Sequence, residues 1–99
     1  MAVDDGERLE RRVHINDLYD LYGPLLTERQ RSVYEMRYFS DFSLAEAAES
    51  LGITRQAVHI LVNRTAERLL ALEKSLGFAA RVKDLEKRIR ELSGESGNV

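Results

Sequence analysis

The chain has 99 residues, of which 43% are hydrophobic and 32% charged, and its formal net charge is -2. This length fits one domain with short tails. The lack of cysteine excludes disulfides and thiolate metal sites, and no apolar run approaches the roughly 18 residues that a membrane-spanning helix needs. We therefore expect a single cytoplasmic domain without membrane insertion.

Apolar residues recur at spacings of three and four along most of the chain, which is the periodicity of helices with one buried face. No run alternates in the way that a half-buried strand would. The first predicted helix runs from about Arg8 to Tyr22. It ends at Gly23-Pro24, because glycine readily adopts the backbone conformation that ends a helix and proline cannot continue its hydrogen bonds. The fold class is therefore predicted to be all-α.

Capping residues mark the starts of the next two helices. Thr27 is a suitable N-cap for a helix that ends near Phe39, and Gln30 follows three residues later as its capping-box partner. Ser43 and Glu46 repeat the same pattern in front of a third helix. Because the connections are short, the sequence predicts a compact helical bundle.

Residues 43–68 have the steric pattern of a helix-turn-helix unit. Two helices that cross closely need a small residue on the first helix, and Ala48 supplies it. The turn needs a residue that tolerates positive φ, and Gly52 supplies that. The second helix is capped by Thr54 and is predicted to run to about residue 74. On this helix, Val58 supplies the branched side chain that packs into the core. An ordinary helical hairpin is the alternative, but it would not require all three features at this spacing.

A C-terminal amphipathic helix is predicted over residues 79–92, after an interruption at Gly77. Its seam either packs against the first helix of the same chain or forms a dimer contact, and we expect a homodimer because helix-turn-helix readers are commonly symmetric dimers. Charges at i, i+4 spacing, Asp84 with Arg88 and Glu86 with Arg90, support the helix. The apolar residues of the seam follow a three-four-three spacing: Val82, Leu85, Ile89 and Leu92.

The predicted organisation is one helical domain over residues 8–92, between disordered tails at 1–7 and 93–99. Glycine and serine are frequent in the C-terminal tail, and the N-terminal tail is polar and acidic.

The charge distribution predicts where nucleic acid would bind. Residues 1–42 hold most of the excess acid, so we expect a nucleic-acid face only in the second half of the chain. Arginine pairs with guanine, and glutamine or asparagine with adenine, in the major groove of double-stranded DNA. Arg64 and Arg68 are predicted to reach flanking phosphates. The predicted base readers lie on the helix face opposite the core: Arg55, Gln56, His59 and Asn63.

The same helix supports a second hypothesis. Ile60 and Leu61 follow His59, and an exposed apolar pair would suit a protein partner better than DNA. If the two side chains are exposed and contiguous, a protein-interaction module is favoured, whereas burial favours DNA. RNA binding is a third and weaker alternative, because the arginines of the last two helices would also suit an RNA backbone.

Several short motifs occur along the chain: Asp20-Leu21-Tyr22, Leu25-Leu26-Thr27, Arg29-Gln30-Arg31, Asp41-Phe42-Ser43-Leu44, Arg55-Gln56-Ala57-Val58 and Arg64-Thr65. With these motifs, the run from Leu25 to Thr65 resembles region 4 of bacterial sigma factors, the part that reads the promoter -35 element. More closely, residues 14–92 resemble the YlxM family of small helix-turn-helix proteins. This resemblance implies base contacts at Arg55, Gln56, His59 and Ile60, although Ile60 departs from the polar residue expected there. It also implies a role in regulating, or acting with, the signal recognition particle pathway, whose components become candidate partners.

The sequence does not favour an enzyme, a metal site or a cofactor. His14 and His59 belong to different predicted helices, whereas a metal site needs several converging ligands. No Ser, His and Asp set has a catalytic motif around it, and no glycine-rich phosphate loop is present. We therefore expect a binding protein.

Overall fold

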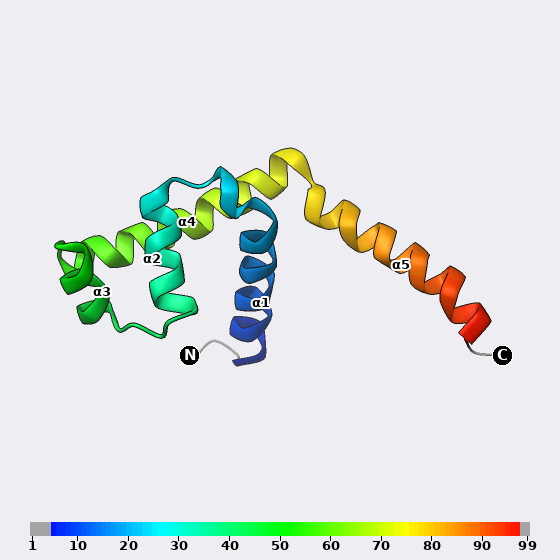
Figure 1. Cartoon of the computed structure of the whole chain (residues 1–99), viewed down its shortest axis with the longest axis horizontal. Helices are drawn as coiled ribbons and strands as arrows, with labels where there is room; N and C mark the ends of the chain where they lie inside the picture. Colours follow the sequence, from blue (N-terminus) through cyan, green and yellow to red (C-terminus); the bar gives the residue numbers. More distant parts are fainter. Residues whose placement is uncertain (1–4, 98–99) are drawn as a thin grey trace.

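The computed structural model describes residues 5–97, with side-chain placement for residues 9–94. Its helical elements follow one another without a strand in this part of the chain (Figure 1). The all-α prediction is thereby confirmed. The elements are α1 (Asp5–Tyr22), the 3-10 turn η1 (Gly23–Leu25), α2 (Glu28–Tyr38), α3 (Leu44–Leu51), α4 (Arg55–Leu76) and α5 (Phe78–Gly97).

The predicted capping boxes are present. The Thr27 hydroxyl accepts a hydrogen bond from the Gln30 amide at 3.1 Å, and the Gln30 side chain accepts one from the Thr27 amide at 3.0 Å. Ser43 and Glu46 make the same reciprocal pair at 3.0 and 2.9 Å. Each box satisfies two amides that a helix start leaves without an intrahelical partner, which fixes where α2 and α3 begin.

One buried cluster joins α1, α2 and the C-terminal half of α4. Tyr19 and Tyr34 stack face to face in it, with ring centroids 4.4 Å apart. Such stacking adds about 0.5–1.5 kcal/mol to the burial of the rings. Its buried members are Ile15, Leu18, Tyr19, Tyr22, Leu26, Tyr34, Leu69, Leu72 and Ala79.

A second buried cluster joins α2, α3 and the N-terminal half of α4. It is smaller, and its buried members are Val33, Ala47, Ala48, Val58 and Val62. Because α2 and α4 each contribute to both clusters, these two helices connect the helix-turn-helix part of the molecule to the packing of α1.

Helix α5 leaves the bundle and projects away from it (Figure 1). The radius of gyration is 17.0 Å, against about 13 Å for a compact domain of this length. Only the beginning of α5 packs on α1, through Ala79, while Ile89 and Leu92 are 61% and 73% exposed. The alternative that the C-terminal seam packs back on the first helix of its own chain is therefore wrong.

The helices at the two ends of the chain are longer than predicted. Helix α1 begins at Asp5 and α5 reaches Gly97, so residues 5–7 and 93–97 are helical where tails were expected. An existing helix gains a hydrogen bond for each residue it adds, which favours such extension. The remaining tail residues, 1–4 and 98–99, lie outside the described part. Within that part, no helix is both long and apolar enough to span a bilayer.

Candidate nucleic-acid interface

The turn between α3 and α4 has the geometry that the sequence predicts. Gly52 adopts φ 69°, ψ 34°, in the left-handed region that favours glycine, and closes α3. The Ile53 amide donates to the Ala48 carbonyl at 3.0 Å, and the Thr54 hydroxyl accepts from the Ala57 amide at 3.0 Å. Val58 is fully buried against Ala48 and its neighbours. These features confirm the helix-turn-helix unit and leave the start of α4 at the molecular surface.

The predicted base readers share the outer face of α4. Arg55, Gln56, His59 and Asn63 are all exposed, whereas Val58 and Val62 of the same helix are buried. The amide of Asn63 lies 3.3 Å from Nε2 of His59, one turn earlier. We call these four residues with Ile60 the reading strip. Its hydrogen-bonding groups are of the kinds that distinguish base pairs in the major groove.

Ile60 and Leu61 do not form a continuous apolar surface. Leu61 is half-buried and packs on the cluster between α2, α3 and α4. Ile60 is 41% exposed and lies among polar members of the reading strip. A single apolar side chain at such a position suits the methyl group of thymine. The pattern that would favour a protein partner here, exposure of both residues, is not met.

Arg64 and Arg68 lie four residues apart along one edge of α4, and both are exposed. Thr65, which lies between the two arginines in the sequence, is buried. Its hydroxyl donates a hydrogen bond to the Leu61 carbonyl at 2.7 Å, so this polar group has a partner inside the core. At about 100° of rotation per residue, Arg64 lies next to Ile60 around the helix axis, at one edge of the reading strip, and Arg68 follows one turn later.

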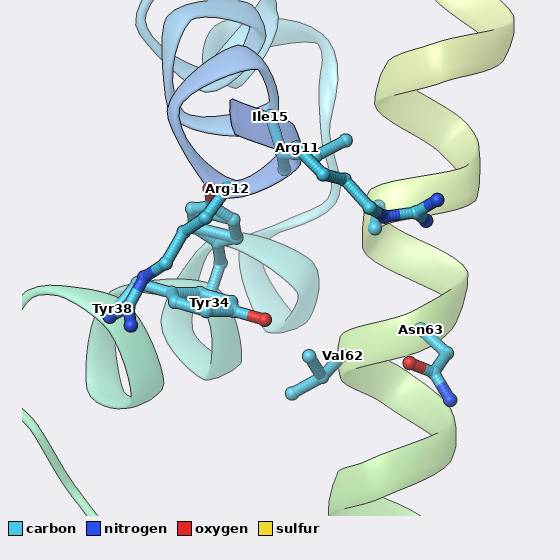
Figure 2. Close-up of a pocket in the computed structure, with 8 residues that line it drawn as sticks. Arg11, Arg12, Ile15, Tyr34, Tyr38, Val62 and Asn63 are labelled. Atoms are coloured by element: carbon cyan, nitrogen blue, oxygen red, sulfur yellow. The ribbon is translucent and has the colours of Figure 1, made fainter. Parts of the chain in front are cut away.

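Two further arginines, which the sequence analysis did not single out, lie near the reading strip. Arg11 and Arg12 of α1 line a cleft of about 340 Å³ together with Asn63 of the reading strip. The Arg11 side chain reaches toward α4, and the Arg12 guanidinium carbon lies 5.0 Å from the centre of the Tyr38 ring (Figure 2). The expectation of a nucleic-acid face only in the second half of the chain came from the charge along the sequence, which does not show which helices lie side by side. The signal in the sequence was the arginine pair Arg11-Arg12, three residues before the apolar Ile15 on the same helix.

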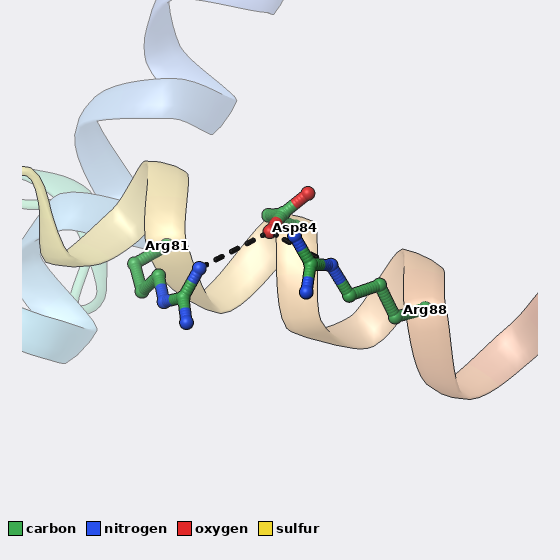
Figure 3. A network of polar contacts seen from close by, with 3 residues as sticks. All are labelled: Arg81, Asp84 and Arg88. Carbon is green, nitrogen blue, oxygen red and sulfur yellow. Dashed lines mark hydrogen bonds and ion pairs between the residues drawn. The ribbon is translucent and has the colours of Figure 1, made fainter.

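A second surface lies on α5 and the outer side of α1. In the part of the chain that is described, the ion pairs are Arg81–Asp84 at 3.4 Å and Arg88–Asp84 at 3.2 Å (Figure 3). The predicted pair of Asp84 with Arg88 is thus confirmed, whereas Glu86 and Arg90 make no such pair. Adjacent to this network, the whole C-terminal seam is exposed: Val82, Leu85, Ile89 and Leu92.

No group of three or more potential metal-binding side chains occurs among the residues with described structure.

The α3–turn–α4 geometry and the exposed polar strip on its second helix define a helix-turn-helix protein. Residues 9–97 match the family model described as "UPF0122: Putative helix-turn-helix protein, YlxM / p13 like". The chain belongs to this family.

Curated relatives support the assignment. A UPF0122 protein of Symbiobacterium thermophilum is 51% identical over 63 residues, which are 64% of this chain and 59% of that relative. One from Caldanaerobacter subterraneus is 40% identical over 75 residues, covering 76% of this chain and 64% of the relative. One from Clostridium botulinum is 46% identical over 81 residues, 82% and 74% of the two chains. The match spans less than two thirds of the first two relatives.

Proposed function

We propose that this protein binds double-stranded DNA in the bacterial cytoplasm as a sequence-reading regulator, and that it is not an enzyme. The observation that carries the proposal is the reading strip, which displays Gln56, His59 and Asn63 to solvent directly after the capped start of α4. In other helix-turn-helix proteins the second helix enters the major groove with its N-terminal residues on the base edges. Helix α4 has the exposure and the polar groups that this docking needs.

Each side chain has a proposed role. Arg55 and Gln56, at the first turn of α4, read bases together with His59 and Asn63 one and two turns later. Ile60 supplies an apolar contact, which suits a thymine methyl group. Arg64 and Arg68, outside the strip, hold the backbone and add affinity without sequence information. The resemblance to region 4 of sigma factors supports the same assignment.

We propose that the protein works as a homodimer held by α5. The seam of α5 is apolar and exposed, and a helix with few tertiary contacts is marginal in water. The outer side of α1 exposes Leu9 and Val13 next to Lys83 of α5, which extends the apolar surface. A second copy of α5 would cover this surface. Two reading strips would then address two half-sites, as in other dimeric readers.

A protein-interaction module of the signal recognition particle pathway is the second candidate. The surface that favours it is the exposed side of α1 and α5, not Ile60 and Leu61. The resemblance to the YlxM family is what connects the protein to this pathway. In this case a component of the particle, in place of a second copy, would cover the seam.

The test is a selection from a library of random-sequence DNA duplexes, followed by salt-titrated binding to the selected duplex and to a scrambled one. We expect an enriched sequence, tighter binding to it than to the scrambled duplex, and weaker binding to both as salt rises. Sedimentation at micromolar concentration provides the mass of the unbound protein. Failure to enrich any sequence, with no binding at low salt, would contradict the DNA proposal and favour the interaction module.

A further inference from the structure

We infer that Arg11 and Arg12 of α1 form a second phosphate-binding site, which takes the DNA backbone on the side of the reading strip opposite Arg64 and Arg68. This inference rests on the proposed DNA binding and deepens it. The starting observation is that both arginines line one cleft with Val62, Asn63 and Ala66 of α4.

The helix geometry places the two arginine pairs on different sides of the strip. Successive residues of an α-helix are rotated by about 100°, so Asn63 and Ala66 share one side of α4, while Arg64 and Arg68 share another. Arg11 reaches toward α4 (Figure 2), and both α1 arginines line the cleft whose α4 wall includes Asn63 and Ala66. A helix in the major groove has a phosphate backbone on each side, because the groove runs between two strands. One basic pair on each side of the strip would give each strand a phosphate contact, which suits such docking.

The Arg12 side chain is held in place by aromatic packing. Its guanidinium lies over the Tyr38 ring, 5.0 Å from the centre, and that ring is tilted against Tyr34 at a centroid distance of 4.7 Å. A cation over an aromatic face is attracted by the ring and loses rotamer freedom before any ligand arrives. The guanidinium retains its outward donors, and arginine binds phosphate through two parallel hydrogen bonds. The site is therefore partly preorganised for a phosphate oxygen.

The cleft itself argues against a purely structural role. It is polar at its rim, through Arg11, Arg12 and Asn63, and apolar at its base, through Ile15 and Val62. Arg11 and Arg12 are both exposed, so their guanidinium groups are accessible to a phosphate. The base reader Asn63 at the same rim connects the site to the reading strip.

The test compares Arg11→Gln/Arg12→Gln with a control of equal charge loss, Lys87→Gln/Arg90→Gln on the projecting α5. Salt-titrated binding is measured on the selected duplex and on its scrambled partner. Each lost phosphate contact reduces the steepness of the plot of log K against log salt by about 0.9. The slope of the α1 variant is therefore expected to be less negative than that of the wild type by about 1.8. Its loss should be equal on both duplexes, because phosphates carry no sequence information. The α5 control should retain the wild-type slope.

The charge-retaining variant Arg11→Lys/Arg12→Lys separates phosphate binding from packing on Tyr38. It is expected to keep the wild-type salt slope even if its melting temperature falls. An unchanged slope in the Gln variant, or an equal change in the α5 control, would overturn the inference while leaving the DNA proposal intact. If the wild-type protein binds neither duplex at low salt, the DNA proposal and this inference fall together.

Discussion

The hydroxyl of Tyr22 donates a hydrogen bond of 2.6 Å to the carboxylate of Glu73, and so joins the end of α1 to the last turns of α4 across 51 residues of sequence. The same carboxylate accepts from the amides of Ala79 and Ala80 at 2.9 and 3.0 Å, at the start of α5. The Phe78 amide donates to the Tyr22 hydroxyl at 3.0 Å. One carboxylate therefore ties three helices together and satisfies amides that the start of α5 leaves without intrahelical partners.

The first prediction concerns acid stability. Burial raises the pKa of Glu73, but the hydrogen bonds from a hydroxyl and two backbone amides, with the charge of His14, lower the pKa below the ordinary value of 4.5. A carboxyl with a lowered folded pKa stabilises the fold above its unfolded pKa, and this contribution is lost as the pH falls through the folded pKa. Wild-type protein should therefore lose stability below about pH 4.5 more steeply than Glu73→Gln.

The measurement is the thermal midpoint by circular dichroism between pH 7 and pH 3. Glu91→Gln, an exposed carboxyl on α5, is the control and should follow the wild-type curve. Parallel curves for wild type and Glu73→Gln would contradict the role given to this carboxylate.

The second prediction concerns Tyr22, the other partner in the hydrogen bond to Glu73. Tyr22→Phe deletes a buried hydroxyl that both donates and accepts, and should cost about 1–2 kcal/mol, because the Glu73 carboxylate and the Phe78 amide each lose a partner. Urea unfolding provides the free energy. The control is Tyr38→Phe, since the Tyr38 hydroxyl makes no side-chain hydrogen bond in the described structure. Equal losses in the two variants would show that the hydroxyl at Tyr22 adds nothing specific.

The third prediction tests the turn. Gly52 has φ 69° and open space around an added Cβ, so the expected effect of Gly52→Val is strain of the left-handed backbone. The expected cost is about 1 kcal/mol or more. Gly94→Ala provides the contrast, since Gly94 lies within α5 with equally open space, and alanine there should stabilise the helix by up to about 1 kcal/mol. An unchanged melting temperature for Gly52→Val would mean that the turn does not need its left-handed conformation.

The fourth prediction addresses the dimer. Ile89 is 61% exposed at the middle of the α5 seam, and Ile89→Asp places a charge where the second copy would pack. Analytical ultracentrifugation at micromolar concentration should show a species heavier than 11.3 kDa for wild type and a shift toward 11.3 kDa for the variant. Arg88→Gln, beside the seam, should keep the wild-type mass. A wild-type protein that sediments only as the 11.3 kDa species would refute the dimer.

The fifth prediction separates base reading from backbone contact. Arg55→Ala should cost about 1–3 kcal/mol on the selected duplex and relax its sequence preference. Arg64→Ala should weaken binding to every duplex and make the dependence of log K on log salt less steep by about 1. The net charge of -2 predicts weak binding to scrambled DNA, strongest at low salt. If both variants lose equally on both duplexes, α4 does not read bases.

Local features of the fold were predictable because their causes are local. Thr27, Ser43 and Gly52 each act on residues within one turn of themselves, and the structure confirms all three. The direction of α5 was not predictable, because an apolar seam indicates that something covers it without indicating what. The proximity of Arg11 to Asn63 was missed for a related reason. Charge counted along the sequence does not show which helices cross.

Helix α4 also acts as a lever arm between the junction at Glu73 and the reading strip. Its 22 residues span about 33 Å at the usual rise of an α-helix. If α5 holds two copies together, a rotation of about 10° where α4 meets Gly77 would move the Arg55 end by about 6 Å. Base pairs are spaced about 3.4 Å apart along the duplex, so this movement approaches two steps of the DNA. A small change in the contacts of Tyr22 and Glu73 would therefore alter the spacing between half-sites that a dimer can span.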